Sequence, residues 1–201
     1  MGTPQKSNAH AQVQSPPSIR FCVLTTQRSG SSWLLSMLNA HPDVRTFMEP
    51  FLYRRNRPGW DGNRFVTFYN YKQHCRWPRP VVTLRYMDAM HTVACGYDAV
   101  GFKLMYGQMF SFPEMVVKLV HDKYRIIHLV RRNYLDIYLS LASAVRRGQF
   151  HTEGPSPPVC RLHVDPDRLL RFVRRMEKKV LAARRMAALL PCPVKEVVYE
   201  E

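Results

Sequence analysis

Short apolar segments rich in β-branched residues alternate with helical segments along this chain, and this alternation limits the possible folds more than any other feature. Five segments are predicted to be strands: 19–26, 45–51, 100–105, 125–131 and 194–199. Helices are expected at 32–40, 81–91, from Pro113, at 133–146 and from Asp165 onward. Strands that alternate with helices are joined by right-handed crossovers and form a parallel sheet. The sequence therefore predicts a three-layer α/β fold, with a central parallel sheet flanked by helices.

A chain of 201 residues suffices for about one domain. Residues 1–18 are polar, contain prolines and lack the apolar segment of a secretory signal, so they are predicted to form a disordered N-terminal tail. The domain is predicted to span residues 19–201. Within it, residues 54–80 are aromatic, basic and rich in Pro and Gly, which is typical of a long loop or lid. No run of about 18 uncharged apolar residues exists, so no membrane span is expected.

Positive charge greatly exceeds negative charge in this sequence. The chain has 30 Lys and Arg residues against 15 Asp and Glu residues, a formal net charge of +15. This excess favours an anionic partner, which could be a nucleic acid, a membrane surface or a small phosphorylated ligand. Many of the basic residues fall in 168–185, where apolar side chains recur at helical spacing. This segment is expected to form a solvated helix face or, alternatively, a polyanion-binding surface.

The five cysteines do not form a metal-binding pattern. They are scattered along the chain and include no C-x-x-C pair. Zinc ligation is therefore not expected, and reduced thiols are the simplest interpretation.

The junction after the first predicted strand has the composition of an anion-binding turn. Residues 25–33 read TTQRSGSSW and lead from the strand into a helix. Helix N-termini favour phosphate or sulfate, and Gly30 lets the backbone approach such an anion closely. The further candidate donors are the hydroxyl groups of Ser29, Ser31 and Ser32 and the guanidinium group of Arg28. An ordinary strand–helix turn with small residues is the alternative.

A second strand–helix junction carries a related set of polar residues. Residues 131–140 read RRNYLDIYLS, so Arg132 is expected at the end of a strand and Ser140 about two turns into a helix. From these positions, a long guanidinium side chain and a short hydroxyl group could converge on one phosphate. Taken singly, Arg132 is explained more simply by a surface salt bridge and Ser140 by a hydrogen bond within its helix.

Together, the two junctions resemble the motifs of sulfotransferases that use 3′-phosphoadenosine 5′-phosphosulfate (PAPS). Residues 28–32 resemble the family's 5′-phosphosulfate-binding loop, in the form with Arg that is similar to carbohydrate sulfotransferases. Residues 132–140 resemble the 3′-phosphate motif. The resemblance implies a P-loop-like fold, PAPS as sulfuryl donor and no metal. The implied cofactor-binding residues are Arg28, Ser29, Gly30, Ser31, Ser32, Trp33, Arg132 and Ser140.

Weaker resemblance continues along the chain, so that it covers roughly residues 19–201. Residues 101–105 resemble the strand before the acceptor site, although Met105 stands where cytosolic members have a catalytic His. Residues 198–201 look like a Tyr-Glu-Asp/Glu segment of carbohydrate sulfotransferases. Domains of this family normally continue beyond this point, so the resemblance implies a C-terminally incomplete domain.

Glu49 is the candidate general base. It lies at the end of the second predicted strand in the segment Glu49-Pro50. Similar Glu-Pro or Glu-Phe segments occur in carbohydrate sulfotransferases, and the resemblance implies that this Glu is the base. A carboxylate in this place could accept the proton of an acceptor hydroxyl group. Arg28 is expected to stabilise charge on the leaving phosphate, with help from Lys103. A strand-end Glu49 paired with Arg45 or Arg54 is the alternative.

These expectations define one predicted activity and two competing ones. The predicted activity is transfer of a sulfuryl group from PAPS to a hydroxyl acceptor, with a carbohydrate favoured. The first alternative is a non-catalytic truncated relative that binds the nucleotide or sulfated or phosphorylated polyanions. The second, a kinase-like protein, lacks support because the G-x-x-x-x-G-K-[ST] pattern of nucleoside-triphosphate sites is missing.

The partners and the location follow from the same expectations. No nucleic acid partner is expected. The chain as written is predicted to be cytoplasmic, and a form with an N-terminal anchor would act in the Golgi lumen, as animal carbohydrate sulfotransferases usually do.

Overall fold

The structure is a computed structural model that describes residues 16–52, 66–148 and 161–201. Most of the predicted tail at 1–18 and much of the expected loop at 54–80 therefore lie outside the described residues. The last residues of the tail segment are placed: Pro17 is buried, and Ser18 Oγ donates a hydrogen bond to the carbonyl oxygen of Asp98 at 3.1 Å. No helix among the described residues is long and apolar enough to cross a membrane.

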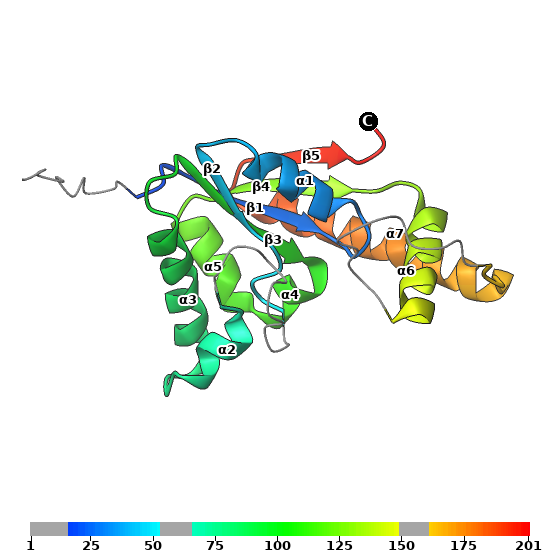
Figure 1. Ribbon diagram of the computed structural model, residues 1–201, viewed down its shortest axis with the longest axis horizontal. Coiled ribbons are helices and arrows are strands. Elements are labelled where there is room, and N and C mark those ends of the chain that lie inside the picture. The colour runs from blue at the N-terminus through cyan, green and yellow to red at the C-terminus, as the bar shows by residue number, and fades with distance from the viewer. Residues whose placement is uncertain (1–15, 53–65, 149–160) are drawn as a thin grey trace, which may run out of the picture.

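The described part of the chain forms a central sheet of parallel strands, in the order β2–β3–β1–β4–β5 (Figure 1). The strands are β1 (Ile19–Thr25), β2 (Val44–Phe47), β3 (Ala99–Met105), β4 (Arg125–Val130) and β5 (Val194–Val198). Strand β1 is central and pairs with β3 on one side and β4 on the other. All carboxyl ends of the strands therefore meet at one edge of the sheet.

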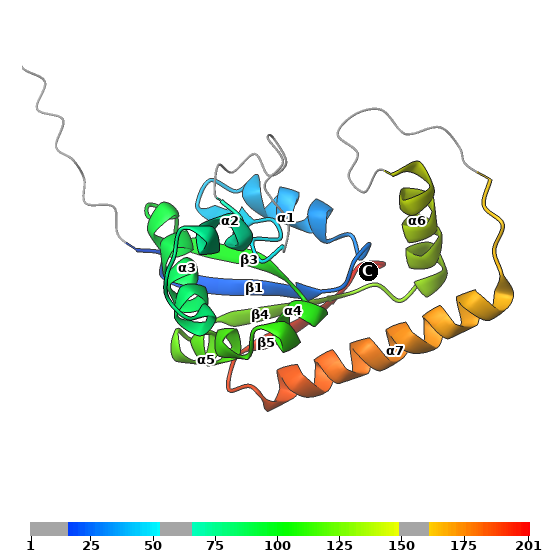
Figure 2. The same ribbon diagram turned by 90° about the horizontal axis from the view of Figure 1, so that it is seen from below.

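Helices cover both faces of this sheet. They are α1 (Ser31–Asn39), α2 (Phe68–Gln73), α3 (Arg79–Val93), α4 (Tyr106–Ser111), α5 (Pro113–His121), α6 (Tyr134–Arg147) and α7 (Pro166–Leu189). Helix α1 lies on one side of the sheet, and α3, α5 and α7 lie on the other (Figures 1 and 2). The predicted α/β class, with a parallel sheet between helical layers, is confirmed.

The alternation of side chains along β1 creates two hydrophobic cores. Cys22 and Leu24 point into the larger core, which α3, α5 and α7 close. Phe21 and Val23 point into the smaller one and pack against Leu35 of α1. Because neighbouring residues of a strand face opposite sides, one apolar strand holds both helical layers in place. Burial of these apolar side chains supplies the main driving force for the fold.

Two local predictions were wrong. The segment 32–40 is apolar on nearly all sides, which predicts a buried helix. In the structure, however, Trp33 is 61% exposed and Met37 is 53% exposed, because α1 faces the sheet with Leu35. The second strand was expected to reach Phe51 but ends at Phe47. It ends early because Glu49, with φ of 35°, leaves the extended conformation.

Helices α2 and α4 were not predicted. Helix α2 falls in the segment expected to be a loop, and its first residue, Phe68, is fully buried against the rings of Phe51 and Phe112. Its N–H group also donates a hydrogen bond to the carbonyl oxygen of Pro50 at 2.8 Å. Distant aromatic contacts therefore stabilise a six-residue helix whose local sequence does not indicate one.

A chain of polar contacts fixes α7 to the sheet. Arg184 of α7 holds both carboxylate oxygens of Glu196 on β5, at 2.7 and 2.8 Å. Glu196 in turn contacts Nδ1 of the buried His128 at 3.1 Å, and His128 Nε2 lies 2.8 Å from the hydroxyl oxygen of Tyr106. Burial lowers the pKa of His128, so its ring is held neutral between these partners.

A second polar cluster lies at the opposite, amino edge of the sheet. His91, which is 7% exposed, shares a 2.5 Å hydrogen bond with the hydroxyl group of Tyr124. Asp122 pairs at 3.0 Å with both Arg20 and Lys118. Burial, followed by the positive charge of Arg20, lowers the pKa of His91 to about 4. The folded protein therefore keeps this ring neutral at pH values where an unfolded chain would protonate it.

We expect His91 to destabilise the folded protein in mild acid. Because its folded pKa is below its unfolded value of about 6.5, the stability it contributes is complete above pH 6.5 and is lost as the pH falls toward 4. The loss is as much as about 3 kcal/mol, since each pKa unit corresponds to about 1.4 kcal/mol. Urea unfolding of His91→Gln between pH 7 and pH 4 should show a flatter pH dependence than the parent protein. The exposed His163→Gln is the control and should leave the slope unchanged.

Candidate functional site

The loop after β1 is held in one conformation by buried hydroxyl groups. Thr25 Oγ1 lies 2.6 Å from Ser29 Oγ and 2.9 Å from the carbonyl oxygen of Leu129 on β4. Ser29, which is fully buried, also donates to the carbonyl oxygen of Thr26 at 2.9 Å. The hydroxyl group of Ser29, predicted to bind the cofactor, is thus used inside the loop. It shapes the loop in which Gly30 and Ser31 present their backbone groups.

The N-terminus of α1 is built to receive an anion. Gly30 is its N-cap residue with φ of 84°, no side chain caps the helix, and its first turn contains no acidic residue. The first N–H groups of a helix have no partner within the helix and lie at the positive end of its dipole. The backbone N–H groups of Ser31, Ser32 and Trp33 occupy this position. They are the groups that an incoming phosphate or sulfate would meet first.

Tyr199, which directly follows β5, lies against Gly30. A Cβ atom at residue 30 would overlap the ring of Tyr199, so only glycine fits there. The guanidinium carbon of Arg131 lies 4.9 Å from the centroid of the same ring, and Trp33 meets the ring edge-on with the centroids 6.3 Å apart. Tyr199 therefore packs together the residues of two junctions that are far apart in the sequence.

The two predicted anion-binding motifs meet directly. Arg28 Nε donates a hydrogen bond to Ser140 Oγ at 2.7 Å, across 112 positions of sequence. Arg131 Nη1 donates to the backbone carbonyl of Arg28 at 3.3 Å. Burial, and then the nearby charge of Arg131, lowers the pKa of Arg28. Two guanidinium groups are thus held close together, and the carboxylate of Asp136, which pairs with Arg131 at 2.8 Å, offsets part of their positive charge.

Arg132 does not join Ser140 as the sequence predicted. Its exposed side chain pairs with Glu201 Oε1 at 2.7 Å. Glu200 accepts hydrogen bonds from the backbone N–H groups of Arg132 at 3.1 Å and Asn133 at 2.9 Å. Although burial acts in the opposite direction, these N–H groups lower the pKa of Glu200. Carboxylates therefore occupy the start of α6, and the exposed Arg132–Glu201 pair is weak enough to exchange for another anion.

Glu49 lies at the same edge of the sheet, bound to Lys103. Lys103 Nζ lies 2.5 Å from Glu49 Oε1, and both side chains are largely buried. The expected alternative pairing was with Arg45 or Arg54, and Arg54 lies outside the described residues. Strand β3 separates β2 from β1, so Glu49 meets Lys103 of β3 and is not directly beside the first loop. Its φ of 35° places a non-glycine residue in the left-handed region.

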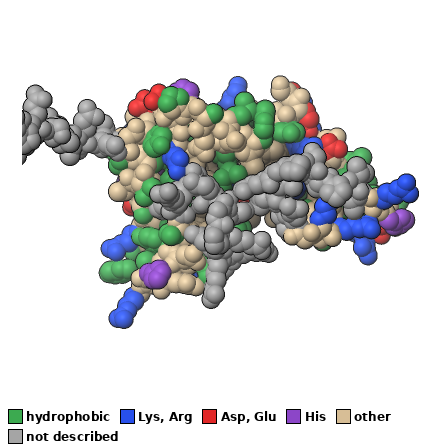
Figure 3. All heavy atoms as spheres, viewed as in Figure 1, with side chains coloured by type: hydrophobic (Ala, Val, Ile, Leu, Met, Phe, Trp, Pro, Cys, Tyr) green, Lys and Arg blue, Asp and Glu red, His purple; other side chains and the backbone are tan. Residues whose placement is uncertain are grey.

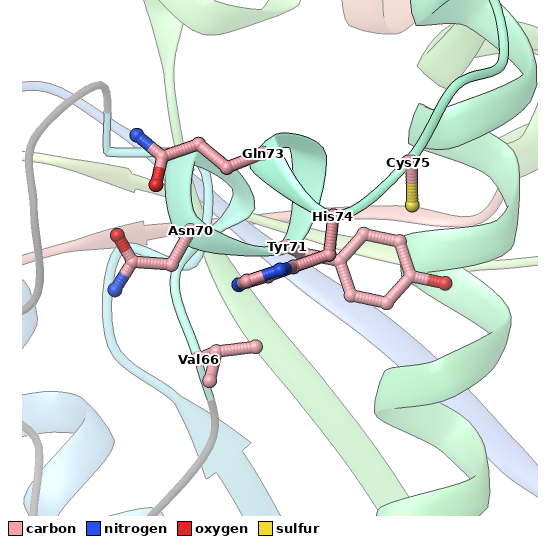
Figure 4. Close-up of a pocket in the computed structure, with 6 residues that line it drawn as sticks. All are labelled: Val66, Asn70, Tyr71, Gln73, His74 and Cys75. Atoms are coloured by element: carbon pink, nitrogen blue, oxygen red, sulfur yellow. The ribbon is translucent and has the colours of Figure 1, made fainter.

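A hollow of about 450 Å³ lies beside α2 (Figure 4). Its lining comprises Val66, Asn70, Tyr71, Gln73, His74 and Cys75. The amide and imidazole groups of this lining could form hydrogen bonds with sugar hydroxyl groups. The hydroxyl group of Tyr86 bonds the carbonyl oxygens of Pro50 and Val66, at 3.0 and 2.8 Å. The rim of the hollow is therefore tied to the segment that carries Glu49.

The chain is similar to the crystal structure of a sulfotransferase from Alicyclobacillus acidocaldarius. The identity is 16% and the TM-score is 0.48, over 92% of this chain and 74% of that chain. No protein-family model matches the sequence, and no curated protein matches it. Such a distant likeness says nothing of the reaction, so the function rests on the geometry of the site.

Sequence reasoning missed Tyr199 and Arg131 as parts of this site. Both directly follow a strand, β5 and β4, and so lie at the carboxyl edge beside Gly30 and Arg28. Position after a parallel strand was the available signal, because ligands of such sheets bind at this edge. Of the predicted residues, the structure brings Arg28, Gly30 and Ser140 together with the exposed Trp33 close by. Glu49 stands one strand further away, and Arg132 is turned toward Glu201.

We expect Gly30→Ala to lower the free energy of unfolding by at least about 2 kcal/mol. The substitution strains a left-handed backbone, at about 1 kcal/mol or more, and adds the overlap with Tyr199. Gly148→Ala is the matched control, since Gly148 also has a positive φ, of 64°, but open space around it. Urea unfolding of both variants would separate the two contributions. Equal losses in the two variants would show that Tyr199 does not close over residue 30.

Proposed function

We propose that this chain is a sulfotransferase that moves a sulfuryl group from PAPS to a hydroxyl group of a carbohydrate. The observation that carries the proposal is the 2.7 Å hydrogen bond between Arg28 Nε and Ser140 Oγ. It joins the loop that resembles a 5′-phosphosulfate site to the helix that resembles a 3′-phosphate site. A nucleotide with phosphates at both positions would be recognised by such a pair of adjoining junctions.

The chain's own groups fit the donor at both ends. The N–H groups at the start of α1 and the guanidinium group of Arg28 would hold the 5′-phosphosulfate, because both supply positive charge. The first turn of α1 contains no acidic side chain that would repel the phosphosulfate. Ser140 and Arg132 would bind the 3′-phosphate, with Arg132 exchanging its exposed carboxylate partner for the phosphate. The exposed ring of Trp33 is available to stack on the adenine.

Glu49 would act as general base and Lys103 would orient it. Among the described residues, Lys103 contacts Oε1 of this carboxylate, which leaves Oε2 to receive a proton. As the acceptor oxygen bonds to sulfur, its proton passes to Glu49, and the bond from sulfur to the bridging oxygen breaks with its electron pair remaining on the phosphate. Arg28 would stabilise the charge that develops on this phosphate.

Backbone strain supports the choice of these residues. Arg28 has φ of 60° and Glu49 has φ of 35°, so both proposed catalytic residues lie in a conformation that non-glycine residues seldom adopt. Strain of this kind costs about 1–3 kcal/mol per residue and persists where the surrounding structure fixes a side chain for function. The third non-glycine residue with positive φ among the described residues, Lys123, lies in the turn before β4.

We expect adenosine 3′,5′-bisphosphate, the product nucleotide, to raise the thermal midpoint of the protein more than AMP or ATP with Mg²⁺. A ligand that binds the folded state alone stabilises it by mass action. Ser140→Ala should weaken the binding of this nucleotide by roughly 10- to 100-fold, because a hydrogen bond to a charged group contributes about 1.5–3 kcal/mol. Ser143→Ala, on the next turn of α6, is the control and should bind normally. An equal response to AMP would contradict the proposed 3′-phosphate site.

We expect Glu49→Gln to reduce sulfuryl transfer by roughly 100- to 10,000-fold, the usual range for a general base. The amide keeps the shape of the side chain, so the nucleotide-induced thermal shift should persist. Transfer of ³⁵S from labelled PAPS to a panel of sugars would measure the loss. Unchanged turnover would remove Glu49 from the mechanism, and a nucleotide shift without transfer in the parent protein would favour the non-catalytic alternative.

A further inference from the structure

Helix α7 presents a basic face that the proposed reaction does not use. Its 24 residues contain eight basic and two acidic side chains. The helix buries Met176, Val180, Ala183 and Ala187 against the sheet. The exposed basic residues are Arg168, Arg171, Arg174, Arg175, Lys178, Lys179, Arg184 and Arg185. The predicted choice between a solvated helix face and a polyanion-binding surface therefore applies to one defined face.

Four of these side chains form a stripe along the helix. At 100° per residue, Arg171, Arg174, Lys178 and Arg185 fall on the side opposite the buried residues. With a rise of 1.5 Å per residue, the stripe is about 21 Å long. A row of charges of this length matches an extended polymer better than a small anion.

Among the described residues, the four side chains of this stripe form no ion pair, although Arg171 is close enough to Asp165 to interact with its charge. The basic residues of α7 that have ion-pair partners are Arg168, which pairs with Asp165, and Arg184, which pairs with Glu196. Arg171, Arg174 and Lys178 follow one another at helical spacings of three and four, where like charges repel. A polyanion lying along the stripe would offset this repulsion and release its own counterions.

The helix that carries the stripe packs against α6, the helix that carries Ser140. Helix α7 packs against α6 through Phe172 and Tyr138, whose ring centroids are 5.3 Å apart, and Tyr138 lies two residues before Ser140. The first half of α7 runs past the carboxyl edge of the sheet beside α6 (Figure 2). Lys and Arg side chains gather at this end of the molecule (Figure 3). A polymer bound along α7 would therefore reach toward the reaction edge.

We propose that the outward face of α7 binds an anionic polysaccharide, which holds the acceptor chain beside the site. The link to catalysis rests on the proposed function, whereas the binding itself does not. A polysaccharide is favoured over a single-stranded nucleic acid because the exposed face of α7 has no aromatic side chain on which bases could stack. Phe172, the aromatic residue of this helix, packs against Tyr138.

The test is binding to immobilised heparin as a function of NaCl concentration. A variant with Arg171, Arg174, Lys178 and Arg185 all changed to Gln should elute at lower salt and show a slope of log Kd against log [NaCl] smaller by roughly three. The matched control changes Arg76, Arg85, Arg125 and Lys195 to Gln, which removes the same charge from exposed positions elsewhere. Both variants should keep the thermal midpoint of the parent. Equal loss of binding in both variants would overturn the proposal, because net charge alone would then explain it.

Two further arms separate the possible outcomes. Chondroitin sulfate should compete for the heparin column, and unsulfated dextran should not. Single-stranded DNA is tested as a competitor at the same concentration of negative charge as chondroitin sulfate. If it competes as well as chondroitin sulfate does, the assignment of a polysaccharide is overturned. The shift caused by adenosine 3′,5′-bisphosphate is measured on the same variants. Heparin binding that depends on the four α7 residues, without a thermal shift by the nucleotide, would support this surface and contradict the proposed function. A thermal shift by the nucleotide, with heparin binding that does not depend on these residues, would overturn this surface alone.

Discussion

The parallel pairing of β1 on both of its sides is the constraint on which the rest of the structure depends. Because β3 and β4 run in the same direction as this strand, the turns that follow all three open at one edge. Each of the three strands brings a cationic side chain to this edge: Arg28 and the start of α1 follow β1, Lys103 lies near the end of β3, and Arg131 follows β4. The same strand separates the two cores, so any slip of its register would move the site and both helical layers together.

Electrostatic balance shapes this edge as much as topology does. The guanidinium groups of Arg28 and Arg131 lie at the first junction. Glu49 pairs with Lys103. Glu200 and Glu201 lie at the start of α6. Arg131 pairs with Asp136 at 2.8 Å and Arg132 with Glu201, so Lys103, Arg131 and Arg132 each have an acidic partner at this edge. Basic residues are abundant in the chain as a whole, yet local pairing decides where an anion is attracted.

The sequence predicted what depends on local pattern and missed what depends on distant contacts. The strands and the two strand–helix junctions at 25–33 and 131–140 could be predicted because short segments encode them. The N-caps of α6 and α7, Asn133 and Asp165, are local features of the same kind. The partner of Ser140 could not, since Arg28 reaches it only through the packing of β1 against β4. Helix α2 escaped prediction for the same reason: the buried aromatic rings around Phe68 stabilise it from elsewhere in the chain.

The packing of Tyr199 on Gly30 also sets an order of assembly. Gly30 follows the first described strand, and Tyr199 follows the last one, so the contact joins positions that are far apart in the sequence. Contacts between such distant positions form late, because a long loop must close before they can be made. Tyr199 can therefore cover Gly30 only after β5 has paired with β4. A chain in which this pairing has not formed would keep the hydrogen bonds of the loop but would lack the ring that packs over it.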